Sequence, residues 1–139
     1  MIKNINLQFL ISYLGFFPFL ITLIDKFFFQ YLNSNIVDDF IIIYSLVIFV
    51  FIGALHWNLS QHVPYKLVIV GFMPSFTTVF IILMFFLSYE VIWIIISLFF
   101  IQLFADNFIY REKFERKIYF MLRVPLSLLI ILCLAIMQL

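Results

Sequence analysis

Five long stretches that carry almost no charged residues most strongly constrain how this chain can fold. A helix needs about 20 mostly apolar residues to cross the hydrocarbon core of a bilayer. Helices are the expected form, because a chain in lipid must satisfy its backbone polar groups internally. The sequence therefore predicts an all-α integral membrane bundle of five transmembrane helices, at about residues 7–24, 40–59, 67–87, 91–110 and 118–139.

Composition supports a membrane protein over a soluble one. Hydrophobic residues make up 67% of the chain and charged residues 11%, and the mean hydropathy is +1.24. A soluble domain carries roughly 25% charged residues, which cover its core with a polar shell. Neither an internal repeat nor a polar linker divides the sequence, so residues 1–139 are predicted to form a single membrane domain. The first apolar stretch is interpreted as a retained helix, because no small-residue cleavage site follows it.

Several functional classes find no support in the sequence. A net charge of +1 provides no basic field for nucleic acid. The single cysteine, Cys133, cannot form an internal disulfide or a cysteine-based metal cluster. His56 and His62 are six residues apart near one helix end, which is a poor arrangement for ligating a haem iron. We expect no metal, no cofactor and no catalytic motif of a familiar kind.

The distribution of Lys and Arg predicts the orientation. With five spans, the N-terminus shares a side with the second and fourth loops. Only Lys26 lies on the opposite side. The N-terminal side holds seven basic residues: Lys3, Lys66, Arg111, Lys113, Arg116, Lys117 and Arg123. Because basic loops stay in the cytoplasm, we expect a multi-pass protein of the bacterial inner (plasma) membrane with its N-terminus cytoplasmic and its C-terminus outside.

Small residues and prolines mark expected contacts between helices. Gly15 and Gly53 each lie on a stripe of small and polar residues, and such stripes allow helices in lipid to approach closely. Pro18 and Pro74 fall inside their predicted helices and are expected to kink them. The kinks are interpreted as structural, with a gating hinge as the alternative.

Polar residues distant in sequence converge on the predicted cytoplasmic face. His56 and Trp57 come near the end of the second helix, Asp106 near the end of the fourth, and Arg123 near the start of the fifth. Ionisable groups at membrane depth usually pair or face the bundle interior. An ion pair between Asp106 and Arg123 is the simplest structural interpretation. The functional alternative is a shallow site for an anionic or quinone-like ligand, or a proton-handling pair, which Tyr119 could join.

These residues also resemble a known family. The run from Phe51 to Trp57 reads Phe-x-Gly-x-x-His-Trp and is similar to the most distinctive motif of the transmembrane protein 69-like family of small bacterial and mitochondrial membrane proteins. Asn58 departs from the glycine that the family more often has there. Weaker matches lie elsewhere: Gly15 and Pro18 to Phe19, Pro74 with Ser75, Asp106, and Tyr119 with Leu122 and Arg123. The resemblance implies a five-helix membrane protein of unknown function.

Three functions remain open on the sequence alone. The leading hypothesis is a non-enzymatic scaffold or assembly partner, surrounded by lipid and bound to other membrane proteins or to copies of itself. The alternative is a binder or transporter of a small anion, lipid or quinone at the cytoplasmic membrane face. The third is an intramembrane enzyme that uses His56 and Asp106 as acid and base.

Overall fold

The computed structural model describes residues 10, 12–54, 65–109, 116 and 119–138, with backbone alone at 66 and 109. Most of these residues are helical, with no strand among them. Residues 12–14 form a short helical piece ahead of the first labelled helix. The elements are α2 (Phe17–Ile24), η1 (Asp25–Phe29), α3 (Ser34–Ala54), α4 (Tyr65–Phe86), α5 (Ile92–Ile109), η2 (Tyr119–Arg123) and α7 (Val124–Met137).

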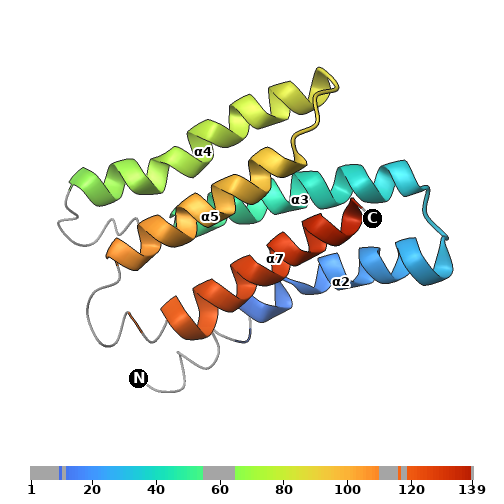
Figure 1. The fold of residues 1–139 in the computed structure, drawn as a ribbon, viewed down its shortest axis with the longest axis horizontal. Helices are drawn as coiled ribbons and strands as arrows, with labels where there is room; N and C mark the ends of the chain where they lie inside the picture. Colours follow the sequence, from blue (N-terminus) through green and yellow to red (C-terminus); the bar gives the residue numbers. More distant parts are fainter. Residues whose placement is uncertain (1–9, 11, 55–64, 110–115, 117–118, 139) are drawn as a thin grey trace.

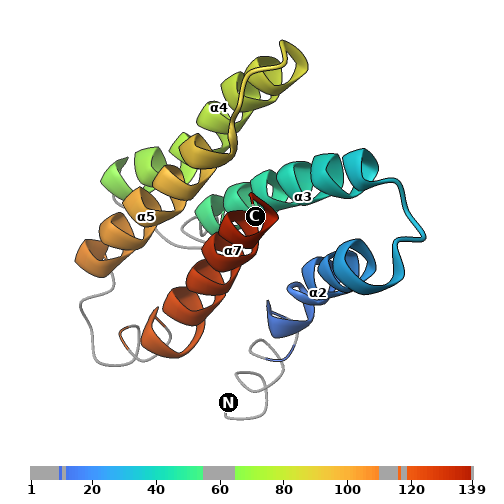
Figure 2. The ribbon, with the colours of Figure 1, turned by 45° about the vertical axis from the view of Figure 1, so that its right-hand side comes forward.

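The helices alternate in direction along the long axis of the molecule (Figure 1). The end of α3, the start of α4, the end of α5 and the start of η2 share one end, which we call the node end. The helix α2 starts nearer the middle of the long axis. The turns at 30–33 and 87–91 and the last turn of α7 share the other, which we call the turn end. In a rotated view α3 and α7 lie between α2 on one side and the α4–α5 pair on the other (Figure 2). The prediction of an all-α bundle of five helices is confirmed.

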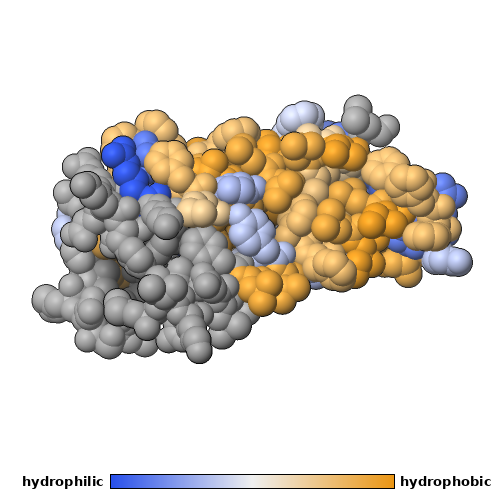
Figure 3. Space-filling view, turned by 90° about the horizontal axis from the view of Figure 1, so that it is seen from below, coloured by the Kyte–Doolittle hydropathy of each residue, from blue (hydrophilic) through white to orange (hydrophobic). Residues whose placement is uncertain are grey.

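Four of the helices are long and apolar enough to cross a membrane. They cover Ser12–Phe29, Ser34–Ala54, Leu67–Phe86 and Tyr119–Met137. The apolar part of α5, Ile92–Phe108, is shorter because polar residues occupy its last turns. Hydrophobic residues cover most of the coloured surface in this view, with a few mildly hydrophilic ones near its middle and strongly hydrophilic ones toward its ends (Figure 3). This pattern matches the apolar core and polar borders of a bilayer.

The first break between helices falls at residues 30–33, later than the sequence indicates. The expected break began at Asp25, but the helix continues through a wide π-helical turn to Phe29. Asp25 is buried, and its carboxylate accepts hydrogen bonds from the backbone N–H groups of Tyr31 and Leu32. A charged residue thus fits inside the helix, because its carboxylate provides hydrogen-bond acceptors for the backbone N–H groups of the loop that follows. The helix ends at Gln30, whose φ of 52° is left-handed.

The second helix starts six residues before the expected Phe40. It begins at Ser34, where the Asn33 side chain accepts a hydrogen bond from the Asn35 N–H at 3.0 Å. This bond satisfies one of the free amides of the first helical turn. The expected end of this helix, at Leu59, lies outside the described residues.

The turn between α4 and α5 is as short as the sequence predicts. Ser88 has a φ of 63°, and its N–H donates to the carbonyl of Phe85 at 2.9 Å. The N–H of Tyr89 donates to the carbonyl of Met84 at 3.1 Å. Together these bonds form a Schellman motif, which closes the end of a helix around one left-handed residue. The chain then reverses, so α4 and α5 form an antiparallel hairpin.

The core runs through the middle of the bundle and receives side chains from every helix. Its fully buried members include Phe19, Ile41, Leu46, Ile95, Phe99, Ile130 and Leu134. Phe49 of α3 and Phe99 of α5 meet with ring centroids 5.4 Å apart. In lipid such contacts hold helices together through close packing, since the surrounding chains are equally apolar.

Candidate functional site

Asp106 is the most deeply buried charged residue described. It lies in the next-to-last turn of α5 with 1% of its surface exposed. Gln102, one turn earlier on the same helix, donates from Nε2 to Asp106 Oδ1 at 2.9 Å. Residues four apart share one helix face, so the sequence itself brings this amide to the carboxylate.

Arg123 reaches Asp106 from a different helix. Its Nε lies 3.9 Å from Asp106 Oδ2, and the guanidinium is 4% exposed. Its Nη2 donates to the carbonyl of Ile52, near the end of α3, at 3.3 Å. One side chain therefore joins α3, α5 and η2. The ion pair expected between Asp106 and Arg123 is present in the structure.

Tyr119 adds a second link between the same two segments. It opens η2, is 7% exposed, and donates from its hydroxyl to the carbonyl of Leu103 in α5 at 3.0 Å. We refer to Gln102, Asp106, Tyr119 and Arg123 as the polar node. The polar node lies where the described parts of α3, α5 and η2 meet (Figure 1), and the node end of the bundle takes its name from it.

The chemistry of the polar node favours fixed structure over proton transfer. The Asp106 carboxylate accepts a hydrogen bond from Gln102 and forms an ion pair with Arg123, so it already contacts two neighbours in the bundle. Breaking such a pair by removing one partner leaves an uncompensated charge in an apolar interior, which costs about 3–5 kcal/mol. The node therefore pins three helices at a defined register.

Two expected members of the cluster, His56 and Trp57, lie outside the described residues. The chain is described up to Ala54, and Ile52 contacts Arg123. The structure therefore brings together Asp106, Arg123 and Tyr119 of the predicted cluster. The predicted convergence of His56 and Trp57 with these residues stays a prediction.

Gly15 and Pro18 interrupt the first helix. Gly15 and Phe16 form a turn after the helical residues 12–14, and α2 starts at Phe17. Pro18 therefore lies in the first turn of α2, where its missing N–H costs no hydrogen bond. The carbonyl of Gly15, released from helical bonding by the turn, accepts a hydrogen bond from the Tyr44 hydroxyl at 2.7 Å.

Gly53 and Pro74 form the contact between α3 and α4. A Cβ atom on Gly53 would lie 2.7 Å from the Gly71 carbonyl oxygen and 2.7 Å from Pro74 Cγ. Real side chains do not approach so closely, so only glycine allows this packing. Pro74 is inside α4 and fully buried. The small residues singled out in the sequence therefore lie at a helix contact.

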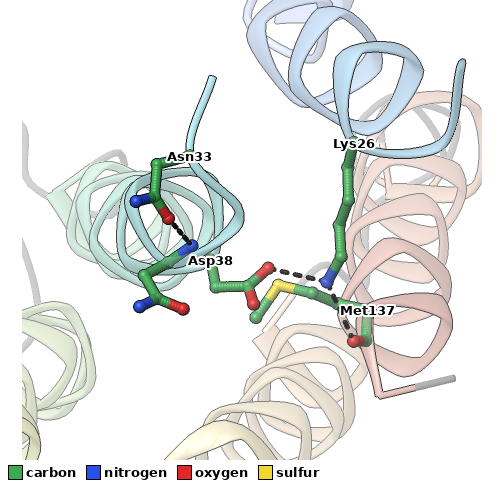
Figure 4. Close-up of polar contacts among 5 residues, drawn as sticks. Lys26, Asn33, Asp38 and Met137 are labelled. Carbon is green, nitrogen blue, oxygen red and sulfur yellow. Dashed lines mark hydrogen bonds and ion pairs between the residues drawn. The ribbon is translucent and has the colours of Figure 1, made fainter. Parts of the chain in front are cut away.

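Lys26 forms a second polar link, which the sequence interpretation did not anticipate. Its Nζ lies 2.7 Å from Asp38 Oδ1 and donates to the carbonyl of Met137 at 3.3 Å (Figure 4). The link joins η1, α3 and the last turn of α7 at the turn end. A cation also suits the carbonyl end of a helix dipole. The sequence did contain a sign of this link, because Lys26 is the single basic residue assigned to this side and lies close in sequence to acidic residues.

The described residues contain no group of three or more His, Cys, Asp or Glu side chains placed to hold a metal ion.

A family model described as "Protein of unknown function (DUF3429)" matches residues 6–139. No curated protein and no solved structure matches the chain.

Proposed function

The chain belongs to the DUF3429 family of proteins of unknown function, and from this premise we propose that it is a non-enzymatic assembly partner of another membrane protein. Its several apolar helices are those of a membrane protein.

We further propose that it forms one domain in a bacterial inner membrane, with its N-terminus cytoplasmic. The seven-to-one distribution of Lys and Arg supports this orientation, and the quoted motifs support the finer transmembrane protein 69-like assignment.

The position of α4 carries the proposal. This helix packs mainly on α3, and 22% of its apolar window is buried, against 44% for α3 (Figure 2). The first span, Ser12–Phe29, is buried to the same 22%, but α2 within it packs on both α3 and α7. Much of α4 therefore faces away from the bundle. We propose that this free surface receives a transmembrane helix of the partner.

The outer surface of α4 has an ordered aromatic strip. Phe72, Phe76 and Phe80 follow one another at one-turn intervals, with ring centroids 5.9 Å and 5.0 Å apart. Each ring is about half exposed. Rings that already pack against one another lose little side-chain freedom on binding, and aromatic residues are enriched in protein interfaces. The strip thus supports a protein neighbour in addition to lipid.

An acid–base enzyme receives less support. Asp106 accepts a hydrogen bond from Gln102 and forms an ion pair with Arg123, so its carboxylate already takes part in helix packing. Its suggested partner in catalysis, His56, is outside the described residues. The scaffold proposal needs neither group to react.

Site-specific photo-crosslinking in cells would test the assembly proposal. A photoreactive residue at Phe76, on the outer face of α4, should give a discrete heavier species that contains a second protein. The matched control is Leu132 of α7, which is also exposed and should give mainly lipid adducts. If both positions give lipid adducts alone, and native mass spectrometry from mild detergent finds only the monomer, the proposal is wrong.

A further inference from the structure

A pocket of about 300 Å³ lies between the first helix, α3 and α7. Its walls include Gly15 and Phe16 from the first helix, Val47 from α3, and Leu126 and Ile130 from α7. Apolar atoms form nearly all of its surface. Cavities of this size are at the lower end of those that bind small ligands, and apolar lining suits an apolar guest.

Two hydrogen bonds fix the walls of this pocket in place. Pro125 lacks the N–H that would bond to the carbonyl of Met121, and that carbonyl accepts from the Tyr13 hydroxyl at 2.7 Å. On the other wall, the Tyr44 hydroxyl donates to the Gly15 carbonyl at 2.7 Å. Each bond ties the first helix to a different neighbour at a point where helical bonding is broken. A pocket held open in this way loses little freedom when it is filled.

The pocket has a polar end and an apolar end. Arg123 contributes to its wall near the start of the last helix, and Ile130 lies seven residues further on, about 10 Å deeper into the bundle. Arg123 is four residues into the Tyr119–Met137 span, about 6 Å from its beginning. A molecule aligned with α7 would therefore place its polar part near the membrane surface and its apolar part toward the middle.

The charge at the polar end distinguishes between kinds of ligand. Arg123 lies 3.9 Å from Asp106, so the two groups together are close to neutral. A second full negative charge at the guanidinium would also meet the Asp106 carboxylate at low dielectric. An uncharged hydrogen-bond acceptor, such as an ester carbonyl, avoids this repulsion.

We propose that the pocket binds one acyl chain of a membrane lipid, with the ester region of the lipid beside Arg123. Bilayer lipids present this combination at this depth: an apolar chain that begins at an ester just below the surface. The pocket would thus hold a structural lipid between α3 and α7. This proposal is independent of the assembly function of α4, which concerns the opposite side of the bundle.

Crosslinking with a photoreactive lipid would test the proposal. The full-length protein is reconstituted in vesicles of phosphatidylethanolamine and phosphatidylglycerol that contain a small fraction of a phospholipid with a diazirine in its acyl chain. After illumination, peptide mass spectrometry should find adducts concentrated on the half-buried lining residues Ile48 and Leu126. Exposed positions such as Phe104 should carry fewer adducts per residue.

Two variants separate pocket binding from general contact with lipid. Leu126→Trp fills the pocket and should reduce the pocket adducts about tenfold, equivalent to about 1.4 kcal/mol of binding free energy. Leu129→Trp makes the same change one turn away at a position that is 37% exposed and should leave them unchanged. Ile48→Phe fills the pocket from the half-buried part of the α3 wall, so a folding defect in one variant does not decide the result.

The outcomes distinguish a lipid from other guests. Adducts spread evenly over exposed residues, or an equal yield in Leu126→Trp, Ile48→Phe and Leu129→Trp proteins that elute as wild type, would overturn the proposal. Displacement of the pocket adducts by a short-chain quinone at concentrations below those of the lipid would also overturn it, in favour of a quinone site. Adducts lost in both filling variants and resistant to quinone would support a bound acyl chain.

Discussion

The buried pair of Asp106 and Arg123 leads to a prediction at the scale of single residues. Asp106→Asn removes the negative charge and leaves the guanidinium of Arg123, which is 4% exposed, in an apolar interior. Loss of one partner of a buried pair costs about 3–5 kcal/mol. We expect a large loss of stability against thermal unfolding in detergent, measured by intrinsic fluorescence.

Asp39→Asn is the matched control, because it makes the same chemical change at an exposed position of α3. It should leave the unfolding midpoint nearly unchanged. A second replacement, Arg123→Gln in the Asp106→Asn background, removes the stranded charge and should restore part of the lost stability. Equal midpoints for Asp106→Asn and Asp39→Asn would show that the pair contributes nothing to stability.

Sequence reasoning identified residues that meet but not all of their partners. The pairing of Asp106 with Arg123 follows from topology, because an antiparallel connection places both near the same end. The contact of Arg123 with the Ile52 carbonyl depends on the position of α3 along the bundle axis relative to α7. Hydropathy does not determine this relative position. The contacts of Lys26 with Asp38 and with the Met137 carbonyl also depend on the axial register of the helices. Packing sets that register, so the sequence pattern did not predict these contacts.

Gly53 leads to a prediction at the scale of elements. Gly53→Ala adds a Cβ where the Gly71 carbonyl oxygen and Pro74 Cγ would each be 2.7 Å away. The carbonyl belongs to a helix backbone and cannot move aside alone, so α3 and α4 must separate. Overpacking of this kind costs about 1–3 kcal/mol. Lower thermal stability should accompany faster proteolysis of α4 in detergent.

Ala54→Val provides the control for this prediction. It adds more volume than Gly53→Ala, but at the next residue, which is exposed. Its stability and proteolysis rate should match those of the unmodified protein. If the two variants behave alike, the close approach of α3 to α4 is not required by the fold.

The ends of the helices were harder to predict than the presence of the helices. Hydropathy located every helix, because the apolar stretches are long and the breaks are polar. It placed the first break at Asp25, since a charge usually marks the end of a span. The structure keeps Asp25 inside the helix because its carboxylate bonds to the backbone of the following loop. Hydropathy counts the charge of a side chain and carries no information about such a bond.

The alternating path of the helices has a consequence for the whole molecule. The turn at 30–33, the turn at 87–91 and the last turn of α7 share one end, while the end of α5 and the start of η2 lie at the other (Figure 1). If the helices cross a membrane, these two groups of residues must lie on opposite sides. The distribution of basic residues predicts that the first group lies outside.

Cysteine labelling in intact cells tests this orientation. The only native thiol, Cys133, is buried and 5% exposed, and replacing it with alanine removes background. In that protein, Asn33→Cys and Ser88→Cys should react with a membrane-impermeant maleimide without permeabilisation, since both lie at the turn end. Arg116→Cys, between α5 and η2, should react only after the membrane is opened. The reverse pattern would invert the orientation, and labelling of Asn33→Cys and Ser88→Cys from different sides would contradict the alternating path, because each connection is fixed to its end of the bundle by its flanking helices.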